Sequence, residues 1–187
     1  MSTAPLEQAI AATRSVLTGV RPDQLAAGTP CQSWKVSDLI NHIVGGQHFF
    51  AAAANGEPPA GGDAPDFSAG DYLAAFDQGT AASLAAFSAD GAMERIMHLP
   101  FGDMPGSAFV GIAATDTFTH GWDLATATGQ STDLAPDLVA GLLVGARAAI
   151  SDSFRGPDGK APFGALQEAP AGSSNADQLA AFLGRTV

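Results

Sequence analysis

Three side chains have the chemistry and the spacing to bind a divalent metal ion. Asp116 and His120 lie four residues apart in a segment with a helical apolar pattern, so both project from one helix face. A carboxylate and an imidazole on one face can bind an ion together, and a third ligand has to come from another helix. His42 is the candidate because it lies in the middle of the predicted helix DLINHIVGG, beside an apolar stripe where a polar group needs a partner.

The same residues also fit an interpretation without a metal. A D-x-x-x-H pair is often only a hydrogen-bonded pair, and a histidine near an apolar face is often a core residue with satisfied hydrogen bonds. In such a protein, which keeps the fold alone, Asp116 would pair with His120 or with a nearby arginine in a dry core. Spacing by itself leaves both interpretations open.

The other polar candidates have supporting or structural roles. Asp123 follows His120 by three residues, so its carboxylate can hold the second imidazole nitrogen, as metal-bound histidines usually require. The alternative for Asp123 is a charge on the helix surface. His48 points to a different side of its helix from His42, and we expect it to be structural. His98 precedes a Pro- and Gly-rich stretch and either lines a pocket mouth or is exposed.

The chain has a single cysteine, Cys31, so an intrachain disulfide is excluded. This cysteine usage fits a reducing cytoplasm, where we expect the protein to be located. A lone cysteine is most often a small packing residue, and we expect this role for Cys31 at the start of the helix that carries His42. Trp122 is likewise expected to pack rather than to stack on a substrate.

The elements that must position these residues are helices. Helical spacing or helix signals cover Leu6–Leu17, Val36–Asn55, Tyr72–Phe87, Ser107–Thr128, Leu138–Ile150 and Ser174–Leu183. Expected start signals are Ser33 or Ser37, Ser68 with Asp71, Ser107, Thr132, and Ser174 with Asp177. Residues 93–99 are predicted to be a short extended piece, and residues 100–106 a loop.

These five or six helices, with almost no strand signal, predict an all-α fold. Four of the helices are long enough to form a bundle, and one or two short helices are added to it. No stretch is convincing as a linker between domains, so we expect a single domain over residues 1–187.

Composition excludes several classes of partner. The chain of 187 residues has 8 Lys and Arg against 19 Asp and Glu, a net charge of −11. This balance argues against binding to nucleic acid and to an anionic membrane surface. The longest apolar stretch, residues 138–150, contains Arg147 and is too short to span a bilayer. The sequence also lacks the motifs of P-loop, Rossmann, zincin and α/β-hydrolase enzymes.

Two dense motifs resemble a known family. The stretch GTPCQSWKVSDLINHIVGG is similar to the T-P-C-x-x-W-x-V-x-D-L-x-x-H-x-x-G motif of the DinB-like superfamily, in the actinobacterial branch related to mycothiol-dependent maleylpyruvate isomerase. The stretch TDTFTHGWDLATATG is similar to the second motif of that branch. The loop FGDMPG between the motifs and the C-terminal L-x-x-F-L-G-R also fit, so the resemblance covers nearly the whole chain.

The resemblance implies a four-helix up-down-down-up bundle, often a homodimer, with a divalent metal held between helices. Its ligand positions fall on His42, Asp116 and His120, and Asp116 replaces a glutamate that is longer by one methylene. The ion implied is Zn²⁺, with Ni, Fe or Mn as alternatives. The implied function is a transferase or isomerase that uses mycothiol, a low-molecular-weight thiol, on a small electrophile. The competing hypothesis is a dimeric bundle that binds a metal or small molecule without catalysis.

Overall fold

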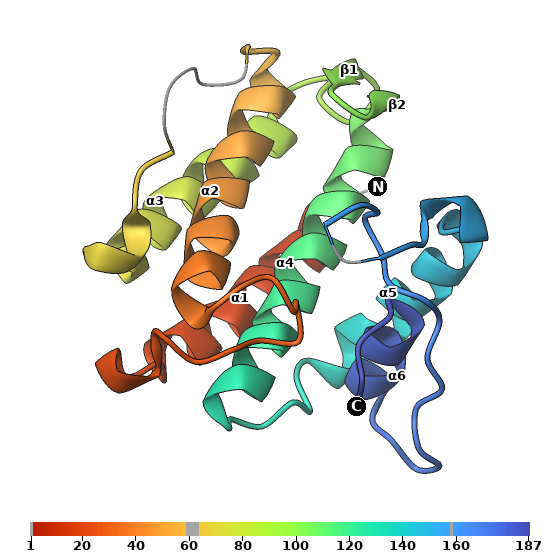
Figure 1. Cartoon of the computed structure of the whole chain (residues 1–187). Coiled ribbons are helices and arrows are strands. Elements are labelled where there is room, and N and C mark those ends of the chain that lie inside the picture. Colours follow the sequence, from red (N-terminus) through yellow and green to blue (C-terminus); the bar gives the residue numbers. More distant parts are fainter. Residues whose placement is uncertain (1, 59–63, 158) are drawn as a thin grey trace.

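The computed structural model describes residues 2–58, 64–157 and 159–187. Within these ranges the chain forms six α-helices, three short 3-10 helices and one two-stranded hairpin (Figure 1). The α-helices are α1 (Ala4–Thr18), α2 (Val36–Asn55), α3 (Tyr72–Ser88), α4 (Gly106–Thr128), α5 (Pro136–Ala149) and α6 (Asn175–Phe182). The expectation of a mostly helical fold is confirmed.

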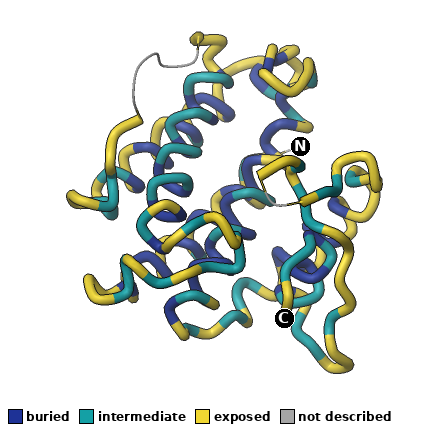
Figure 2. The backbone as a smooth tube through the Cα atoms, in the orientation of Figure 1, coloured by how far each residue is buried: buried dark blue, intermediate teal, exposed yellow. Residues whose placement is uncertain are grey.

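The two helices that carry the candidate ligands, α2 and α4, contact each other in the interior. Helix α1 packs along α4, and α3 packs along α2. Helices α5 and α6 pack on each other and against α4, on the side away from α3 (Figure 1). Buried positions follow the facing sides of the helices (Figure 2). The largest fully buried side chains include Phe76, Phe87, Phe109, Phe118 and Trp122.

The segment between α3 and α4 differs in part from its prediction. An extended piece is present within residues 93–99, as expected, and forms β1 (Ile96–Leu99). The following stretch is not only a loop, because Gly102–Pro105 forms β2, which pairs antiparallel with β1. Gly102 begins the return strand with φ = 126°, a conformation that side-chain-bearing residues rarely adopt. A strand forms only when it pairs with another segment of the chain, so the Pro- and Gly-rich composition of this stretch did not predict β2.

Two helix starts are capped by acidic side chains rather than by the expected serines. Helix α2 begins after Lys35, not after Ser33 or Ser37, and α3 begins after Asp71 itself, while Ser68 lies in a 3-10 helix. For α2, the carboxylate of Asp38 in the first turn accepts the backbone N–H of Lys35 at 2.9 Å. For α3, the carboxylate of Asp71 accepts the backbone N–H of Ala74 at 3.0 Å. A carboxylate near a helix start also interacts favourably with the helix dipole.

Two further starts are set by proline. Helix α4 begins at Gly106 after Pro105, so the expected cap Ser107 lies inside the first turn. Helix α5 begins at Pro136, because the fixed φ of proline suits the first helical position. The residue before it, Ala135, is held outside the right-handed helical region, and Thr132 lies too far away to cap the helix.

Other predicted boundaries are confirmed. Helices α2 and α4 end at Gly56 and Gly129, which adopt the left-handed conformation with φ of 74° and 70°. Ser174 caps α6, and its hydroxyl accepts the backbone N–H of Asp177 at 3.1 Å. In the described part of the chain, none of the helices has the length and apolar character to span a membrane.

Gly121, next to His120 on α4, permits a close approach of α1. A Cβ at this position would overlap the hydroxyl of Thr13 and come within 3.3 Å of the Thr13 Cα. Thr13 is buried, and its hydroxyl donates to the carbonyl of Thr117 at 2.9 Å, so it cannot turn away without losing that hydrogen bond. We expect Gly121→Ala to lower the free energy of unfolding by about 1–3 kcal/mol.

Thermal denaturation measures this effect, at about 2–4 °C of melting temperature per kcal/mol for a protein of this size. Gly111→Ala is the matched control, because Gly111 lies on the same helix and a Cβ there would meet nothing within 4 Å. The control protein should be as stable as wild type or more stable, since alanine favours a helix over glycine. A Gly121→Ala protein with an unchanged melting temperature would show that α1 and α4 do not need this close approach.

Candidate metal centre

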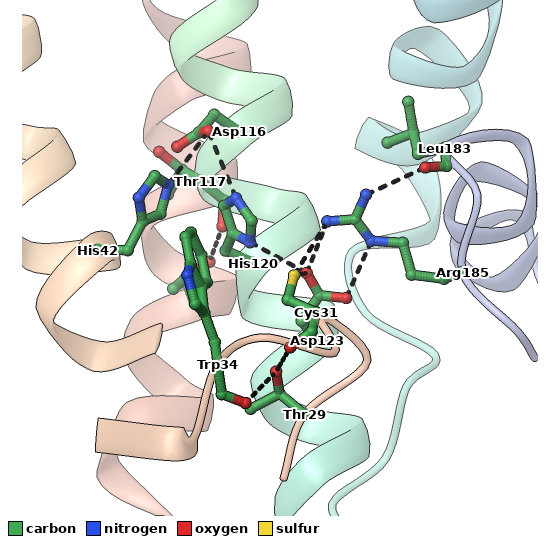
Figure 3. Close-up of polar contacts among 11 residues, drawn as sticks. Thr29, Cys31, Trp34, His42, Asp116, Thr117, His120, Asp123, Leu183 and Arg185 are labelled. Carbon is green, nitrogen blue, oxygen red and sulfur yellow. Dashed lines mark hydrogen bonds and ion pairs between the residues drawn. The ribbon is translucent and has the colours of Figure 1, made fainter. Parts of the chain in front are cut away.

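The three candidate ligands converge from two helices. His42 projects from α2, and Asp116 and His120 project from adjacent turns of α4 (Figure 3). The Nε2 atoms of His42 and His120 lie 3.5 Å and 3.6 Å from Oδ1 of Asp116. One donor atom from each residue lies within 4.8 Å of the other two, so this group could hold a metal ion.

The separations in this group fit a shared ion better than a set of hydrogen bonds. Two ligand atoms on one tetrahedral zinc ion, each about 2.0–2.1 Å from it, lie about 3.4 Å apart. Nε2 of His42 is buried and makes no hydrogen bond to any residue that the structure describes. Its contact with Asp116 is an ion-pair distance of 3.5 Å, and a buried nitrogen without a hydrogen bond is costly. A metal ion among these atoms would bind it, so the donor set fits a divalent cation.

The site is more open at one end than at the other. The side chains of His42 and Asp116 are 36% and 30% exposed, whereas those of His120 and Asp123 are 12% and 0% exposed. Trp34, on the connector before α2, packs against both imidazoles, with ring centroids 4.7 Å from His42 and 5.6 Å from His120. Trp34 restrains the orientation of both rings, and a ligand can approach from the side of His42 and Asp116.

Asp123 lies behind His120, as the spacing predicted. Its Oδ2 is 3.0 Å from Nδ1 of His120, and the carboxylate is fully buried, so the alternative of a surface charge is wrong. A carboxylate can only accept at this contact, which assigns the imidazole proton to Nδ1. Nε2 is then left as a lone pair facing Asp116, the arrangement that a metal-bound histidine requires.

Arg185 is a residue of this site that the sequence reasoning did not single out. It follows α6 and donates from Nε to Oδ1 of Asp123 at 3.1 Å and from Nη2 to Oδ2 at 2.8 Å (Figure 3). The only sequence signal for it was the resemblance of the C-terminal L-x-x-F-L-G-R segment, which ends at this arginine. Asp123 is therefore shared between a guanidinium and the imidazole of His120.

Cys31 makes polar contacts that the sequence did not predict. Its Sγ lies 3.4 Å from Oδ2 of Asp123 and 3.7 Å from Nη2 of Arg185. Cys31, His120 and Asp123 form a second group of atoms close enough to hold a metal. The guanidinium of Arg185 already supplies a positive charge to this second group, and it would repel a divalent ion placed there. The first group is therefore the better metal site.

The charges around the site hold both carboxylates ionised. Burial is the largest influence on Asp123 and raises its pKa, but the His120 hydrogen bond and the Arg185 guanidinium together lower that pKa to about 2. Burial also raises the pKa of Asp116, but the neighbouring His120, His42 and Arg185 together outweigh burial, so this pKa lies below its usual value. Asp123 in turn raises the pKa of Arg185 against the effect of burial.

The remaining candidates lie away from this site. His48 stacks on Phe67, with ring centroids 5.6 Å apart, in a structural contact. His98 lies on β1 with its side chain 80% exposed, beside Asp103 of β2, and it also lines a surface pocket between β1 and the end of α2, so both of its predicted positions are observed. Trp122 is buried as predicted, and its indole N–H donates to Asp177 of α6 at 2.9 Å.

Comparison with known proteins identifies the family. The sequence profile of the family described as the mycothiol maleylpyruvate isomerase N-terminal domain matches residues 6–125. The chain belongs to this family. The match includes His42, Asp116, His120 and Asp123, and it stops before α5, α6 and Arg185.

Two relatives of the chain are uncharacterized proteins of Mycobacterium tuberculosis, one from strain H37Rv and one from strain CDC 1551. Each is 46% identical over 175 residues, which cover 92% of this chain and 91% of the relative. The similarity therefore extends through most of the C-terminal region that the family profile does not match. No solved structure matches the chain.

Proposed function

We propose that this protein binds a divalent metal ion through His42, Asp116 and His120 and uses the ion to activate a low-molecular-weight thiol. The thiol, of the mycothiol class, would be transferred to a small electrophile or would assist its isomerisation. Asp123 supports the centre from behind His120. The observation that carries the proposal is the buried Nε2 of His42, which makes no hydrogen bond in the described part of the chain and faces a carboxylate and a second imidazole.

The donor set supports a reactive rather than a structural ion. Two imidazoles and one carboxylate leave at least one coordination position free, as in catalytic zinc sites. A bound Zn²⁺ or similar ion lowers the pKa of a coordinated thiol or water and thereby supplies a nucleophile. The partly exposed side of His42 and Asp116 is where a thiol would enter. The family assignment independently connects this fold with mycothiol.

Three finer features belong to the same proposal. We assign Zn²⁺ as the first choice of ion, with Ni, Fe and Mn as alternatives that the same ligands accept. We assign α1–α4 to a DinB-like bundle of up-down-down-up topology, to which α5 and α6 are added. The homodimer, the single domain and the cytoplasmic location remain predictions from the sequence.

Thiol binding to cobalt-substituted protein tests the proposal. We expect Co²⁺ bound at the site to develop a thiolate-to-metal charge-transfer absorption in the near ultraviolet when mycothiol is added. Such a band arises only when sulfur ligates the metal. The experiment should use Cys31→Ser protein beside wild type, because the thiol of Cys31 lies close to His120 and Asp123 and could itself ligate added cobalt.

The expected result is the same mycothiol-dependent band in wild-type and Cys31→Ser proteins. Methanol added in place of the thiol should leave the spectrum unchanged. A protein that binds Co²⁺ tightly but shows no band at saturating thiol would contradict the thiol step. That result would favour the alternative, a metal-binding bundle without catalysis.

A further inference from the structure

Every nitrogen of the Arg185 guanidinium is engaged near the candidate metal centre. Nε and Nη2 donate to the two oxygens of Asp123, and Nη1 donates to the carbonyl of Leu183 at 3.1 Å. Nη2 also lies 3.7 Å from Sγ of Cys31. The side chain is only 11% exposed, so this arginine is largely withdrawn from solvent. Its contacts point to a role within the protein rather than in binding an anionic substrate.

We propose that Arg185 is a positioning residue of the metal centre, which acts on His120 through Asp123. The proposal rests on the metal binding proposed above. It adds that the C-terminal segment after α6, outside the residues matched by the family profile, completes the site. Metal affinity would then depend on a residue that touches no ligand atom.

The geometry of Asp123 carries this inference. Its Oδ2 accepts from Arg185 at 2.8 Å and lies 3.0 Å from Nδ1 of His120. The two-point contact with the guanidinium fixes the plane of the carboxylate, which a single contact would leave free to rotate. Oδ2 is thereby held where it accepts the Nδ1 proton of His120. The opposite nitrogen of the same ring then points at Asp116.

Two features of the structure place the side chain of Arg185 next to α4. Helix α6 ends in a turn at Gly184, which has φ = 93°, and the backbone N–H of Arg185 donates to the carbonyl of Ala180 at 2.9 Å. Trp122 of α4 donates to Asp177 on α6 and ties the two helices together. The turn and this hydrogen bond hold the side chain of Arg185 against α4, where Asp123 lies (Figure 3).

A thermodynamic cycle of Co²⁺ dissociation constants tests the proposal on the full-length protein. The proteins are wild type, Arg185→Met, Asp123→Asn and the double variant, each checked for helical content by circular dichroism. Loss of an outer partner of a metal ligand typically weakens metal binding by about 10–100-fold. We expect Arg185→Met to weaken Co²⁺ binding by about 10-fold, at the lower end of that range. In the Asp123→Asn background, the same change should have no further effect, because Arg185 acts through Asp123.

Two more variants separate positioning from general stability. Arg185→Lys keeps the charge without the two-point contact, and it should also weaken binding, by less than Arg185→Met. Arg155→Met is the matched control: Arg155 is similarly buried, at 9% exposed, and donates to the carbonyls of Gly164 and Phe182 but to no residue of the site. It should leave Co²⁺ affinity unchanged even if it lowers the melting temperature.

The outcomes distinguish this inference from the proposed function. An Arg185→Met protein with wild-type affinity for Co²⁺ would overturn the inference alone. An equal loss in the wild-type and Asp123→Asn backgrounds would also overturn it, because Arg185 would then act by another route. A wild-type protein that binds no Co²⁺ would remove the proposed metal function, and this inference with it.

Discussion

Asp123→Ala protein is expected to be less stable than wild type by about 3–5 kcal/mol in its free energy of unfolding. The carboxylate is fully buried and serves two partners, the guanidinium of Arg185 and the Nδ1 atom of His120. Its removal leaves a guanidinium that is 11% exposed without its counter-charge. Breaking a buried ion pair by removing one partner is costly because the other charge stays buried and unpaired.

Urea denaturation followed by circular dichroism measures this loss. Asp77→Ala is a suitable control because Asp77 also makes a two-point contact with an arginine, Arg14, at 2.6 Å and 2.7 Å. That pair lies at the surface, with side chains 48% and 45% exposed, so its loss should cost far less stability than the loss of Asp123. An equal decrease in the free energy of unfolding in the two variants would show that the contacts of Asp123 stabilise the protein no more than a surface ion pair does.

The second large effect is expected at the ligands themselves. We expect His42→Ala and His120→Ala each to weaken binding of a divalent metal by more than about 100-fold, because losing even an outer partner costs about 10–100-fold. In the wild-type protein the two imidazoles face the same oxygen of Asp116, so neither variant retains a three-residue donor set. Metal titration against a competing chelator measures both affinities.

His48→Ala is the matched control for this prediction. His48 lies on the same helix as His42, but it stacks on Phe67 and belongs to neither group of possible metal ligands. Its replacement should leave metal affinity unchanged. If His48→Ala weakened metal binding as strongly as His42→Ala, the loss would reflect damage to α2 rather than a missing ligand.

Sequence periodicity brought together most residues of this candidate site because three of them lie on one helix. Asp116, His120 and Asp123 share one helix face through spacings of four and three residues, which any regular helix imposes. His42 could be assigned to the centre of a second helix, since its segment has a clear apolar stripe. The fold class followed from the same patterns, apart from the hairpin of β1 and β2.

The parts that the sequence did not reveal depend on tertiary contacts. Arg185 lies 62 residues after Asp123, and no local pattern indicates that the turn after α6 returns to α4. Cys31 is 92 residues from Asp123, so no local sequence pattern indicates the polar contact between these two side chains. The packing of Trp34 on both imidazoles likewise requires α2 and α4 to be side by side.

These residues form a layered arrangement around one imidazole. His120 faces the candidate ion position through Nε2 and faces Asp123 through Nδ1. Arg185 in turn donates to Asp123. The contacts therefore connect the candidate ion position, through His120 and Asp123, to the C-terminal segment that carries Arg185. In a protein that kept the fold alone, the Nε2 atom of His42 would stay buried without a hydrogen bond to any described residue, which costs stability.

The metal content of the purified protein tests the central claim most directly. Elemental analysis should be applied to wild type, His42→Ala, His120→Ala and the control His48→Ala, all prepared in parallel without added chelator. We predict about one divalent ion per chain in wild type and in His48→Ala, and almost none in His42→Ala and His120→Ala. Equal metal content in all four proteins, or none in any of them after exposure to Zn²⁺, would contradict a metal centre at His42, Asp116 and His120.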